Sequence, residues 1–403
     1  MKHVTDTPHS PVTKVVLTGG PCAGKTTALA YLGERLAAAG VAVYTVPEAA
    51  TLIFGAGVNI GEVLRAGKVA EFQRQLLTCQ IELEDRLAQL AELSRGERPA
   101  VILCDRGALD NAAYMEDGAF DDLVISMGLS VSELRERYDA VVCLVTAADG
   151  AEEHYNLDND ARSETPEEAR ALDLRTRQAW TGHEHLTVIG NRRDGKKISF
   201  TEKLRWLEQA VSGVVGIPAA AEIERKYLLR EGAAEALLQA ATEMGVRVTA
   251  LDITQTYLRR DEQGAERRIR ARRPQGHRVA SLETVYTYTE KKNVTPLIRH
   301  EATRRLNLGE YRDLERQRDP SLGVIEKTRY NFLWEGQYFH LDRFWGLGES
   351  YELVEVELVD EADTVELPPV LAERLVGEVT EDPRWRNADI ARRIAEANGV
   401  GSE

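Results

Sequence analysis

The sequence predicts an α/β domain with a parallel sheet and helices on both faces, followed by an α+β domain built on an antiparallel barrel. Two observations predict this order. In the first half, short apolar strands alternate with helical stretches, and the first strand leads into a glycine-rich loop. In the second half, short strands carry charged residues at every second position. The length of 403 residues also exceeds what one hydrophobic core usually supports.

The composition is that of a folded globular protein, with 43% hydrophobic and 29% charged residues. No run approaches the ~20 apolar residues of a membrane helix, and the N-terminus lacks the apolar core of a signal peptide, so we expect a cytoplasmic protein. The net charge of −15 disfavours nucleic acid as a partner, so a polyanionic ligand requires local basic clusters. The cysteines lack the CxxC spacing of a metal site and are expected to be reduced: Cys22, Cys79, Cys104 and Cys143.

A phosphate-binding loop follows the first predicted strand, 14–18. The pattern GxxxxGK[ST] is complete, and an alanine- and leucine-rich helical stretch follows it. Backbone N–H groups in such a loop cradle the β-phosphate, and the helix N-terminus adds partial positive charge. Lys25 is placed to neutralise the β- and γ-phosphates of ATP or GTP, and Thr26 to ligate Mg²⁺. The predicted nucleotide-binding residues are Gly19, Gly20, Pro21, Cys22, Ala23, Gly24, Lys25, Thr26 and Thr27.

Acidic residues follow the second and third predicted strands, 41–46 and 99–104. Open α/β sheets bind ligands at the carboxyl ends of their strands. Glu48 could therefore take a proton from an acceptor hydroxyl, or it could cap the following helix, and the local sequence leaves both open. Asp105 ends an apolar strand and is expected to hold Mg²⁺ directly or through water.

Through Pro47-Glu48 and Asp105-Arg106-Gly107, the first half resembles the P-loop kinases of small molecules, above all the deoxynucleoside and thymidylate kinases. The segment 18–27 resembles the branch named AAA-type ATPase, which includes ribosylnicotinamide-kinase-like domains. The resemblance implies that Glu48 is a catalytic base and that Arg106 contacts the acceptor or a phosphate. The acceptor pocket is expected to be lined by two segments, 51–68 and the helix around Asp110 and Asn111.

The same resemblance implies a lid and a base-binding position. Arg162, in the polar segment after the fourth predicted strand, is the first candidate for closing on the transferring phosphoryl group. Arg175 and Arg177 in the next helix are expected on a solvated face with i,i+4 ion pairs. Asn191, after the last strand, is expected to contact adenine.

A domain boundary is expected after the helix near residues 203–211. Gly213, Gly216 and Pro218 follow this helix, and such residues interrupt regular structure. The expected domains are therefore 1–212 and 221–403, joined by a linker at 213–220.

Charged residues alternate along the predicted strands of the second domain. In Glu222-Ile-Glu224-Arg-Lys226, a period of two places Glu222, Glu224 and Lys226 on one face. A half-exposed sheet would explain one such strand, but the pattern recurs: Arg268-Ile-Arg270-Ala-Arg272, Lys327-Thr-Arg329 and Glu355-Val-Glu357. Several strands with charges of both signs suit a closed barrel with a polar lumen. Buried charges of this kind require water, partners, metal or an anion.

These motifs resemble the CYTH domain of the triphosphate tunnel metalloenzymes, whose hallmark is ExExK. The resemblance implies an eight-stranded antiparallel tunnel that binds triphosphate with Mg²⁺ or Mn²⁺ and hydrolyses its terminal phosphoanhydride. The implied metal ligands are Glu222, Glu224, Glu357 and Glu355, the last of which is alternatively a water-positioning group. The implied phosphate-binding residues are Lys226, Arg268, Arg270, Lys291, Arg299, Lys327 and Arg329, with Glu301 and Asp342 orienting them.

The register of two strands stays open. Lys291 is chosen over the adjacent Lys292 by alternation alone. A one-residue slip would turn other arginines inward, namely Arg267, Arg272 and Arg273.

Three functional hypotheses follow. The first is a bifunctional enzyme that phosphorylates a small molecule from ATP and cleaves a triphosphate or polyphosphate. The second makes the first domain a regulatory NTPase or nucleotide sensor. The third makes the barrel a non-hydrolytic receptor for a polyphosphate or a phosphorylated headgroup.

Overall fold

The structure, a computed structural model, describes residues 12–155, 164–217, 223–260, 264–275, 284–293, 299–347 and 351–397. For residues 292–293 and 299–302 only the backbone is described. The chain divides into two compact units, Met1–Ala220 and Ala221–Glu403, and each is taken separately below. None of the helices in the described ranges is both long enough and apolar enough to cross a membrane.

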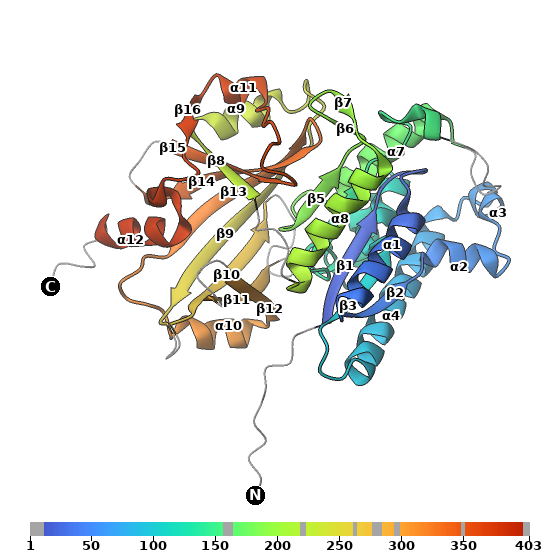
Figure 1. Ribbon diagram of the computed structural model, residues 1–403, viewed down its shortest axis with the longest axis horizontal. Coiled ribbons are helices and arrows are strands. Elements are labelled where there is room, and N and C mark those ends of the chain that lie inside the picture. Colours follow the sequence, from blue (N-terminus) through green and yellow to red (C-terminus); the bar gives the residue numbers. More distant parts are fainter. Residues whose placement is uncertain are drawn as a thin grey trace, which may run out of the picture. The chain divides into compact units, whose positions relative to one another are not determined.

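Unit 1 is built on a parallel sheet with the strand order β2-β3-β1-β4-β5 (Figure 1). The strands are β1 (Val12–Thr18), β2 (Ala42–Val46), β3 (Ala100–Asp105), β4 (Ala140–Leu144) and β5 (Leu186–Ile189). The central strands are buried on both faces, which explains why their sequences are continuously apolar. The predicted α/β class is confirmed, and the strands lie close to the expected residues.

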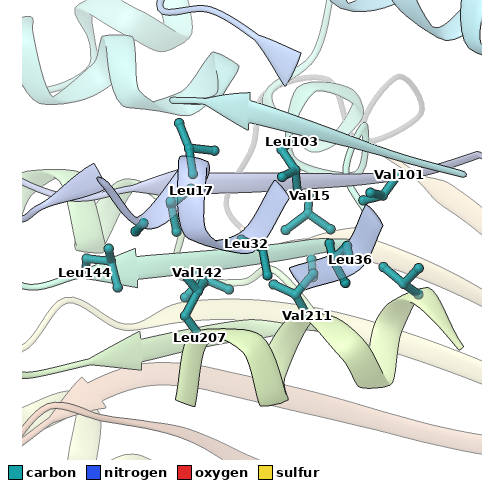
Figure 2. Packing of buried hydrophobic residues seen from close by; sticks show 14 of the residues in the cluster. Val15, Leu17, Leu32, Leu36, Val101, Leu103, Val142, Leu144, Leu207 and Val211 are labelled. Carbon is teal, nitrogen blue, oxygen red and sulfur yellow. The ribbon is translucent and has the colours of Figure 1, made fainter. Parts of the chain in front are cut away.

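Helices cover both faces of this sheet (Figure 1). α1 (Lys25–Ala38) and α8 (Phe200–Val215) pack on one face, and α4 (Val69–Ser94) lies against β2 and β3. Figure 2 shows the first of these layers, in which both helices meet the sheet through Leu32, Leu36, Leu207, Val211, Val15, Leu17, Val101, Leu103, Val142 and Leu144. Full burial of one such side chain contributes about 1.5–3 kcal/mol, so this layer rigidly supports the loop that precedes α1.

Short elements connect the strands of unit 1. They are α2 (Ala49–Gly55), α3 (Ile60–Arg65), η1 (Ala108–Tyr114), α5 (Ala119–Ser126), α6 (Val131–Arg135), η2 (Glu152–His154), α7 (Pro166–Ala179), β6 (Arg192–Arg193) and β7 (Lys196–Lys197). α7 begins with a capping box, in which Thr165 and Glu168 exchange hydrogen bonds and Pro166 takes the first helical position. Its start is therefore fixed by local sequence.

Unit 2 is an antiparallel sheet with the order β12-β11-β10-β9-β13-β14-β15-β8-β16. Its long strands are β8 (Ile223–Arg230), β9 (Thr249–Leu258), β10 (Glu266–Pro274), β11 (Val285–Asn293), β12 (Arg299–Leu306), β13 (Ile325–Trp334), β14 (Gln337–Trp345) and β15 (Tyr351–Leu358). The resemblance implied eight such strands, but no motif of the sequence analysis lies on β9. A short ninth strand within the described ranges, β16 (Leu375–Glu378), pairs with β8 at the edge and was not predicted.

Alternation along these strands separates an apolar outer face from a charged inner face. Helices α9 (Ala233–Ala240) and α11 (Pro369–Ala372) cover one part of the outer face, and α10 (Leu308–Glu315) covers another. The outer clusters include Tyr227, Leu229, Phe332, Phe339, Leu341, Val354, Val356, Leu258, Ile269, Leu306 and Tyr311. The inner face is the other side of the sheet. It carries Lys226, Arg270 and Glu355, which alternate along their strands with the residues of the outer face.

Apolar side chains fill one end of the inner face. α12 (Asn387–Ala397) and η3 (Pro383–Trp385) pack there against Leu228, Tyr257, Ile325, Phe344 and Leu353. The contact is close, since the Gly323 N–H donates to the Ala391 carbonyl at 2.8 Å. A Cβ on Gly323 would lie 2.6 Å from Ile394, so a glycine is required where α12 meets the sheet.

Candidate functional site

The phosphate-binding loop of unit 1 requires glycine at both ends. Gly19 has φ +139°, and a Cβ there would lie 2.0 Å from the Leu144 carbonyl oxygen. Gly24 has φ +84°, and a Cβ there would lie 2.5 Å from the Phe200 ring. Both positions are therefore closed to other residues. α1 begins immediately after this loop, so the first N–H groups of the helix face the same space.

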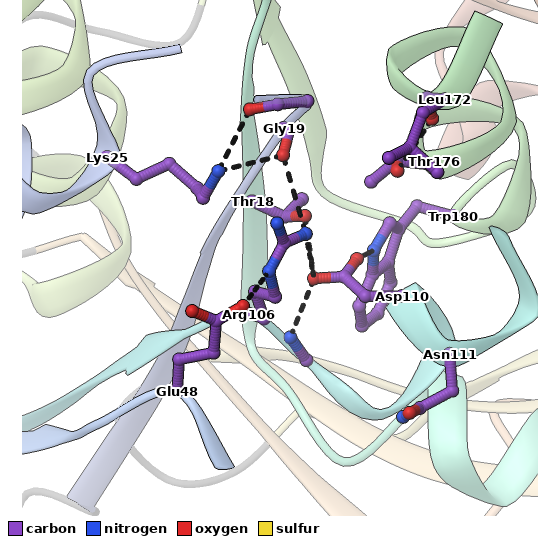
Figure 3. A network of polar contacts seen from close by, with 12 residues as sticks. Thr18, Gly19, Lys25, Glu48, Arg106, Asp110, Asn111, Leu172, Thr176 and Trp180 are labelled. Carbon is purple, nitrogen blue, oxygen red and sulfur yellow. Dashed lines mark hydrogen bonds and ion pairs between the residues drawn. The ribbon is translucent and has the colours of Figure 1, made fainter. Parts of the chain in front are cut away.

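Lys25 is folded back onto the loop (Figure 3). Its Nζ donates to the Gly19 carbonyl at 2.9 Å and to the Gly20 carbonyl at 3.0 Å. Burial and the nearby Arg106 lower the pKa of Lys25 to about 8, although Asp105, Glu48 and Asp110 act in the opposite direction. The adjacent Thr26 and Thr27 are exposed. The cation is thus held where a phosphate group would replace the carbonyls as its partner.

Glu48 and Arg106 form an ion pair beside this loop (Figure 3). Arg106 Nε lies 2.5 Å from Glu48 Oε1, and Thr51 donates to the other carboxylate oxygen at 2.7 Å. Glu48 occupies the N-cap position of α2, but its side chain makes no capping hydrogen bond. Burial alone would raise the pKa of Glu48, but Arg106, Thr51 and Lys25 together lower it. The carboxylate is therefore anionic at neutral pH and faces Arg106.

Asp105 has the environment expected of a cation ligand. Burial raises its pKa, opposed by Lys25. Its Oδ1 is buried and has no hydrogen-bond partner among the residues of unit 1 that the structure describes. A buried acceptor without a donor is costly unless a cation or water occupies it. This environment fits a divalent cation at Asp105, and Thr26 as its second ligand stays a prediction.

The remaining predictions for unit 1 concern Arg162, Asn191 and the arginines of α7. Arg162 lies outside the described residues. Asn191 donates to the carbonyls of Thr146 and Asp149, both at 2.7 Å, and accepts from Lys203 at 2.8 Å. These bonds join the ends of β4, β5 and α8, and the adenine contact stays a prediction. The expected i,i+4 ion pair is present between Arg177 and Asp173 at 2.9 Å, but it is largely buried rather than solvated, and Arg175 donates to the Met115 carbonyl.

In unit 2, the inner face carries a continuous network of opposite charges. Glu355 accepts from Lys226 at 2.7 Å and from Arg329 at 2.6 Å. Asp342 accepts two hydrogen bonds from Arg329, at 2.7 and 2.6 Å, and one from Lys327 at 2.6 Å. Burial and Arg329 lower the pKa of Lys327 to about 8, although Asp342 raises it. Burial opposes ionisation of Glu355, but Arg329 and Lys226 hold its pKa well below the usual range.

β10 adds a row of buried arginines to this face. Arg268, Arg270 and Arg272 occupy alternate positions and are 8%, 8% and 6% exposed. Arg270 Nε donates to Gln255 on β9 at 2.6 Å. The neighbours point outward: Arg267 donates to the Arg259 carbonyl, and Arg273 pairs with Asp252. The expectation that a slip would be needed to turn Arg272 inward was wrong, because Arg272 has the same phase as Arg268 and Arg270.

Register resolves the choice between the adjacent lysines of β11. Lys291 is paired with Glu266 of β10 and has the same phase as Thr287 and Thr289, which lie opposite Arg270 and Arg268. Lys291 also pairs in register with Glu301 of β12. Arg299 and Glu301 lie on β12, but their side chains are outside the described residues. The backbone therefore places both strands in the phase that the sequence predicted.

Two carboxylates lie directly opposite each other near the other end of the inner face. Glu224 of β8 is paired in register with Glu357 of β15, and Glu222 lies outside the described residues. Burial and the charge of Glu355 raise the pKa of Glu224. Lys226 Nζ lies 3.1 Å from Glu224 Oε2 and supplies one cation at this end. The two carboxylates also provide oxygen ligands of the kind that fit a divalent metal. No cluster of three or more His, Cys, Asp or Glu ligands occurs within the described ranges.

Comparisons with known proteins match parts of this chain. Residues 14–197 match the AAA domain family. An inorganic triphosphatase of Acetivibrio thermocellus is 38% identical over 69 residues, which cover 17% of this chain and 42% of the relative. The matched segment thus spans less than half of the curated relative.

Solved structures also match part of the chain. The crystal structure of an inorganic triphosphatase is 28% identical and covers 43% of this chain and 95% of its own, with a TM-score of 0.29. A Pyrococcus horikoshii protein is 18% identical and covers 45% of this chain and 92% of its own, with a TM-score of 0.25. These scores are low, so the description of the fold rests on the strand pairing itself. Residues 14–197 are thus an AAA-type P-loop domain, and the chain is also similar in sequence to an inorganic triphosphatase.

Proposed function

We propose that this chain is a bifunctional phosphate-transfer enzyme. Unit 2 hydrolyses the terminal phosphoanhydride of a triphosphate or short polyphosphate with a divalent metal, Mg²⁺ or Mn²⁺. Unit 1 binds a magnesium nucleotide and transfers its γ-phosphoryl group to a small molecule. The observation that carries the first assignment is the inner face of unit 2, which has a row of buried arginines on β10 and two carboxylates paired in register on β8 and β15.

The inner face supplies the groups that the hydrolysis needs. Arg268, Arg270 and Arg272 would bind phosphate oxygens, because charge-assisted hydrogen bonds from arginine are geometrically specific for phosphate. Glu224 and Glu357 would hold a metal, which supplies charge neutralisation at the phosphate oxygens when bound. Glu355 would orient the attacking water by accepting its hydrogen bond. Its lowered pKa makes it a weak base, so orientation rather than proton abstraction is its role.

The nucleophilic step conserves all atoms. The water oxygen attacks the terminal phosphorus in line, the bond from that phosphorus to the bridging oxygen breaks, and the protons of the water end on phosphate oxygens of the two products. The electron pair of the broken bond stays on the leaving phosphate chain. Lys226, Lys327 and Arg329, which pair with Glu355 and Asp342 in the structure, would neutralise this charge when the triphosphate is bound.

In unit 1, the ion pair next to the phosphate-binding loop supports phosphoryl transfer. Glu48 is anionic and would accept the proton of an acceptor hydroxyl after a substrate displaces Arg106 from it. Arg106 would then contact a phosphate. Lys25, Thr26 and Asp105 would hold the magnesium nucleotide, and Arg162 and Asn191 would complete the lid and the base contact as predicted.

A metabolite screen with ATP tests both assignments. Purified full-length protein is compared with Lys25→Ala and Lys226→Ala by mass spectrometry, in parallel with phosphate release from inorganic triphosphate, ATP, GTP and thiamine triphosphate. We expect one phosphorylated product that depends on Lys25 and phosphate release that depends on Lys226. Release from none of these compounds would favour a receptor role for unit 2. ADP formation without a phosphorylated product would favour a regulatory NTPase in unit 1.

A further inference from the structure

Asp110 is a buried carboxylate that the proposed chemistry does not use. It lies in η1 and is 2% exposed. Its Oδ1 accepts from Trp180 Nε1 at 2.7 Å, and its Oδ2 accepts from Thr18 Oγ1 at 2.7 Å and from the Gly107 N–H at 3.1 Å. Figure 3 shows Asp110 among these donors. The donors come from the end of β1, from the loop after β3 and from the residue that follows α7.

Arg106 adopts a conformation that needs support. Its φ is +70°, and this left-handed region costs a residue other than glycine about 1–3 kcal/mol. Its N–H donates to the Leu17 carbonyl at 3.1 Å, and its carbonyl accepts from Gln80 at 3.1 Å. The next peptide is held by Asp110 through the Gly107 N–H. Asp110 Oδ2 also lies 4.0 Å from Arg106 Nη1, so the carboxylate acts on both the backbone and the charge.

Trp180 limits how the loop after β3 can move. A Cβ on Gly107 would lie 2.5 Å from the Trp180 ring and 2.8 Å from Val16. The indole therefore packs directly on the Gly107 backbone while its N–H holds Asp110. The same helix, α7, carries Asp173, whose Oδ1 accepts from the Gly20 N–H at 2.7 Å. Asp110 itself receives donors from the end of β1, from the loop after β3 and from the residue after α7.

We propose that Asp110 is a positioning residue that keeps Arg106 in the conformation in which its guanidinium reaches Glu48. Without this carboxylate, the Gly107 N–H and the Trp180 N–H are buried donors with no acceptor. The loop then relaxes toward an ordinary φ at Arg106, and the guanidinium leaves Glu48. The inference rests on the proposed function only in taking Glu48 and Arg106 as the acting groups.

The test follows Arg106 directly in the full-length protein. Asp110→Asn is nearly isosteric but replaces one acceptor oxygen with a donor. The readout is hydrogen exchange at Arg106 Nε–H, assigned by NMR through its loss in Arg106→Lys. We expect exchange about tenfold faster or more, because the ion pair with Glu48 opens more often. We also expect a shift of the Trp180 indole N–H resonance, assigned through Trp180→Phe.

Two further variants keep the test decisive. Thr18→Val removes one donor to Asp110 without changing volume, and we expect faster exchange at Arg106 in the same direction. Thr176→Val removes a buried hydroxyl that bonds to the Leu172 carbonyl and does not touch Asp110, so exchange at Arg106 should not change. If Asp110→Asn does not fold, Thr18→Val decides the matter. Unchanged exchange in the folded variants would overturn the inference, whereas absence of phosphoryl transfer in the wild type would overturn the proposed function alone.

Discussion

The charge of Lys25 depends on pH near neutrality. Its pKa of about 8, lowered first by burial and then by Arg106, makes the amine cationic below that pH and neutral above it. Phosphate oxygens favour the cationic form. We therefore expect affinity for Mg-ADP to fall as the pH rises from about 7 to about 9, with proton uptake on binding near the pKa. Isothermal titration calorimetry in two buffers of different ionisation enthalpy measures both quantities.

Lys25→Arg provides the control, because a guanidinium stays charged across this range. Whatever affinity remains in this variant should not vary with pH. Lys203, whose pKa is lowered to about 8 mainly by burial, is retained in the same variant. A pH dependence that persists in Lys25→Arg would therefore assign the effect to another group.

Glu355 should stabilise unit 2 when it is ionised. Its folded pKa lies well below the ordinary value, so its contribution is complete above the unfolded pKa and is lost as the pH falls toward the folded pKa. Glu355→Gln removes one buried partner from Lys226 and from Arg329, which keep Glu224 and Asp342, and we expect a loss of about 1–3 kcal/mol at neutral pH. Urea unfolding followed by tryptophan fluorescence, with chelator present, measures it.

The matched control for this stability change is Glu357→Gln on the same strand. Glu357 is exposed, so without metal its removal should cost less than about 1 kcal/mol. Below about pH 5, the Glu355→Gln variant should also show a flatter dependence of stability on pH than the wild type. Equal losses in both variants would contradict the assignment of the buried network.

Site residues could be predicted from the sequence where they belong to a short local motif. Lys25 and Asp105 follow from the phosphate-binding loop and from the end of an apolar strand. The role of Asp110 could not be predicted, because its partners Thr18 and Trp180 lie 92 and 70 residues away in the sequence. The hydrogen bonds of Asn191 could not be predicted for the same reason, because its partners lie at the ends of β4 and α8.

At the level of one strand, β10 offers adjacent arginines on opposite faces. Arg272 is buried on the inner face, whereas Arg273 is exposed and pairs with Asp252. A charge-assisted hydrogen bond contributes about 1.5–3 kcal/mol, so Arg272→Gln should raise the KM for inorganic triphosphate by about tenfold or more. Steady-state phosphate release measures the change.

Arg273→Gln removes the same charge from the same strand. Its KM should stay within about twofold of the wild type, because an exposed ion pair contributes little. Similar effects of the two substitutions would mean that net charge, and not the face of the strand, determines binding.

Strands were predictable where alternation runs over many residues. β8, β10, β13 and β15 each repeat a charged residue at every second position, and a slip by one residue would bury a different set. β16 was not predicted because it spans only Leu375–Glu378, contains a glycine and pairs through an irregular register. Short edge strands are specified by the neighbour they pair with rather than by their own sequence.

Over the whole chain, the two activities should be separable by point substitution. The units have separate hydrophobic cores, and each carries its own polar site. Lys25→Ala should abolish nucleotide binding and leave triphosphate hydrolysis within about twofold, while Lys226→Ala should do the reverse. Fluorescent-nucleotide titration and phosphate release on the same preparations measure both. Loss of both properties in either variant would show that the units are coupled.

The apolar cluster around α12 has a consequence for product release. It fills the end of the inner face beside Leu228 and Leu353, whereas the paired carboxylates Glu224 and Glu357 lie toward the opposite end. If the proposed substrate binds between them, the apolar end would make the departing phosphates retrace the route by which the substrate arrived. Pyrophosphate would then compete with fresh substrate for the same arginines, and turnover would slow as product accumulates even while substrate remains abundant.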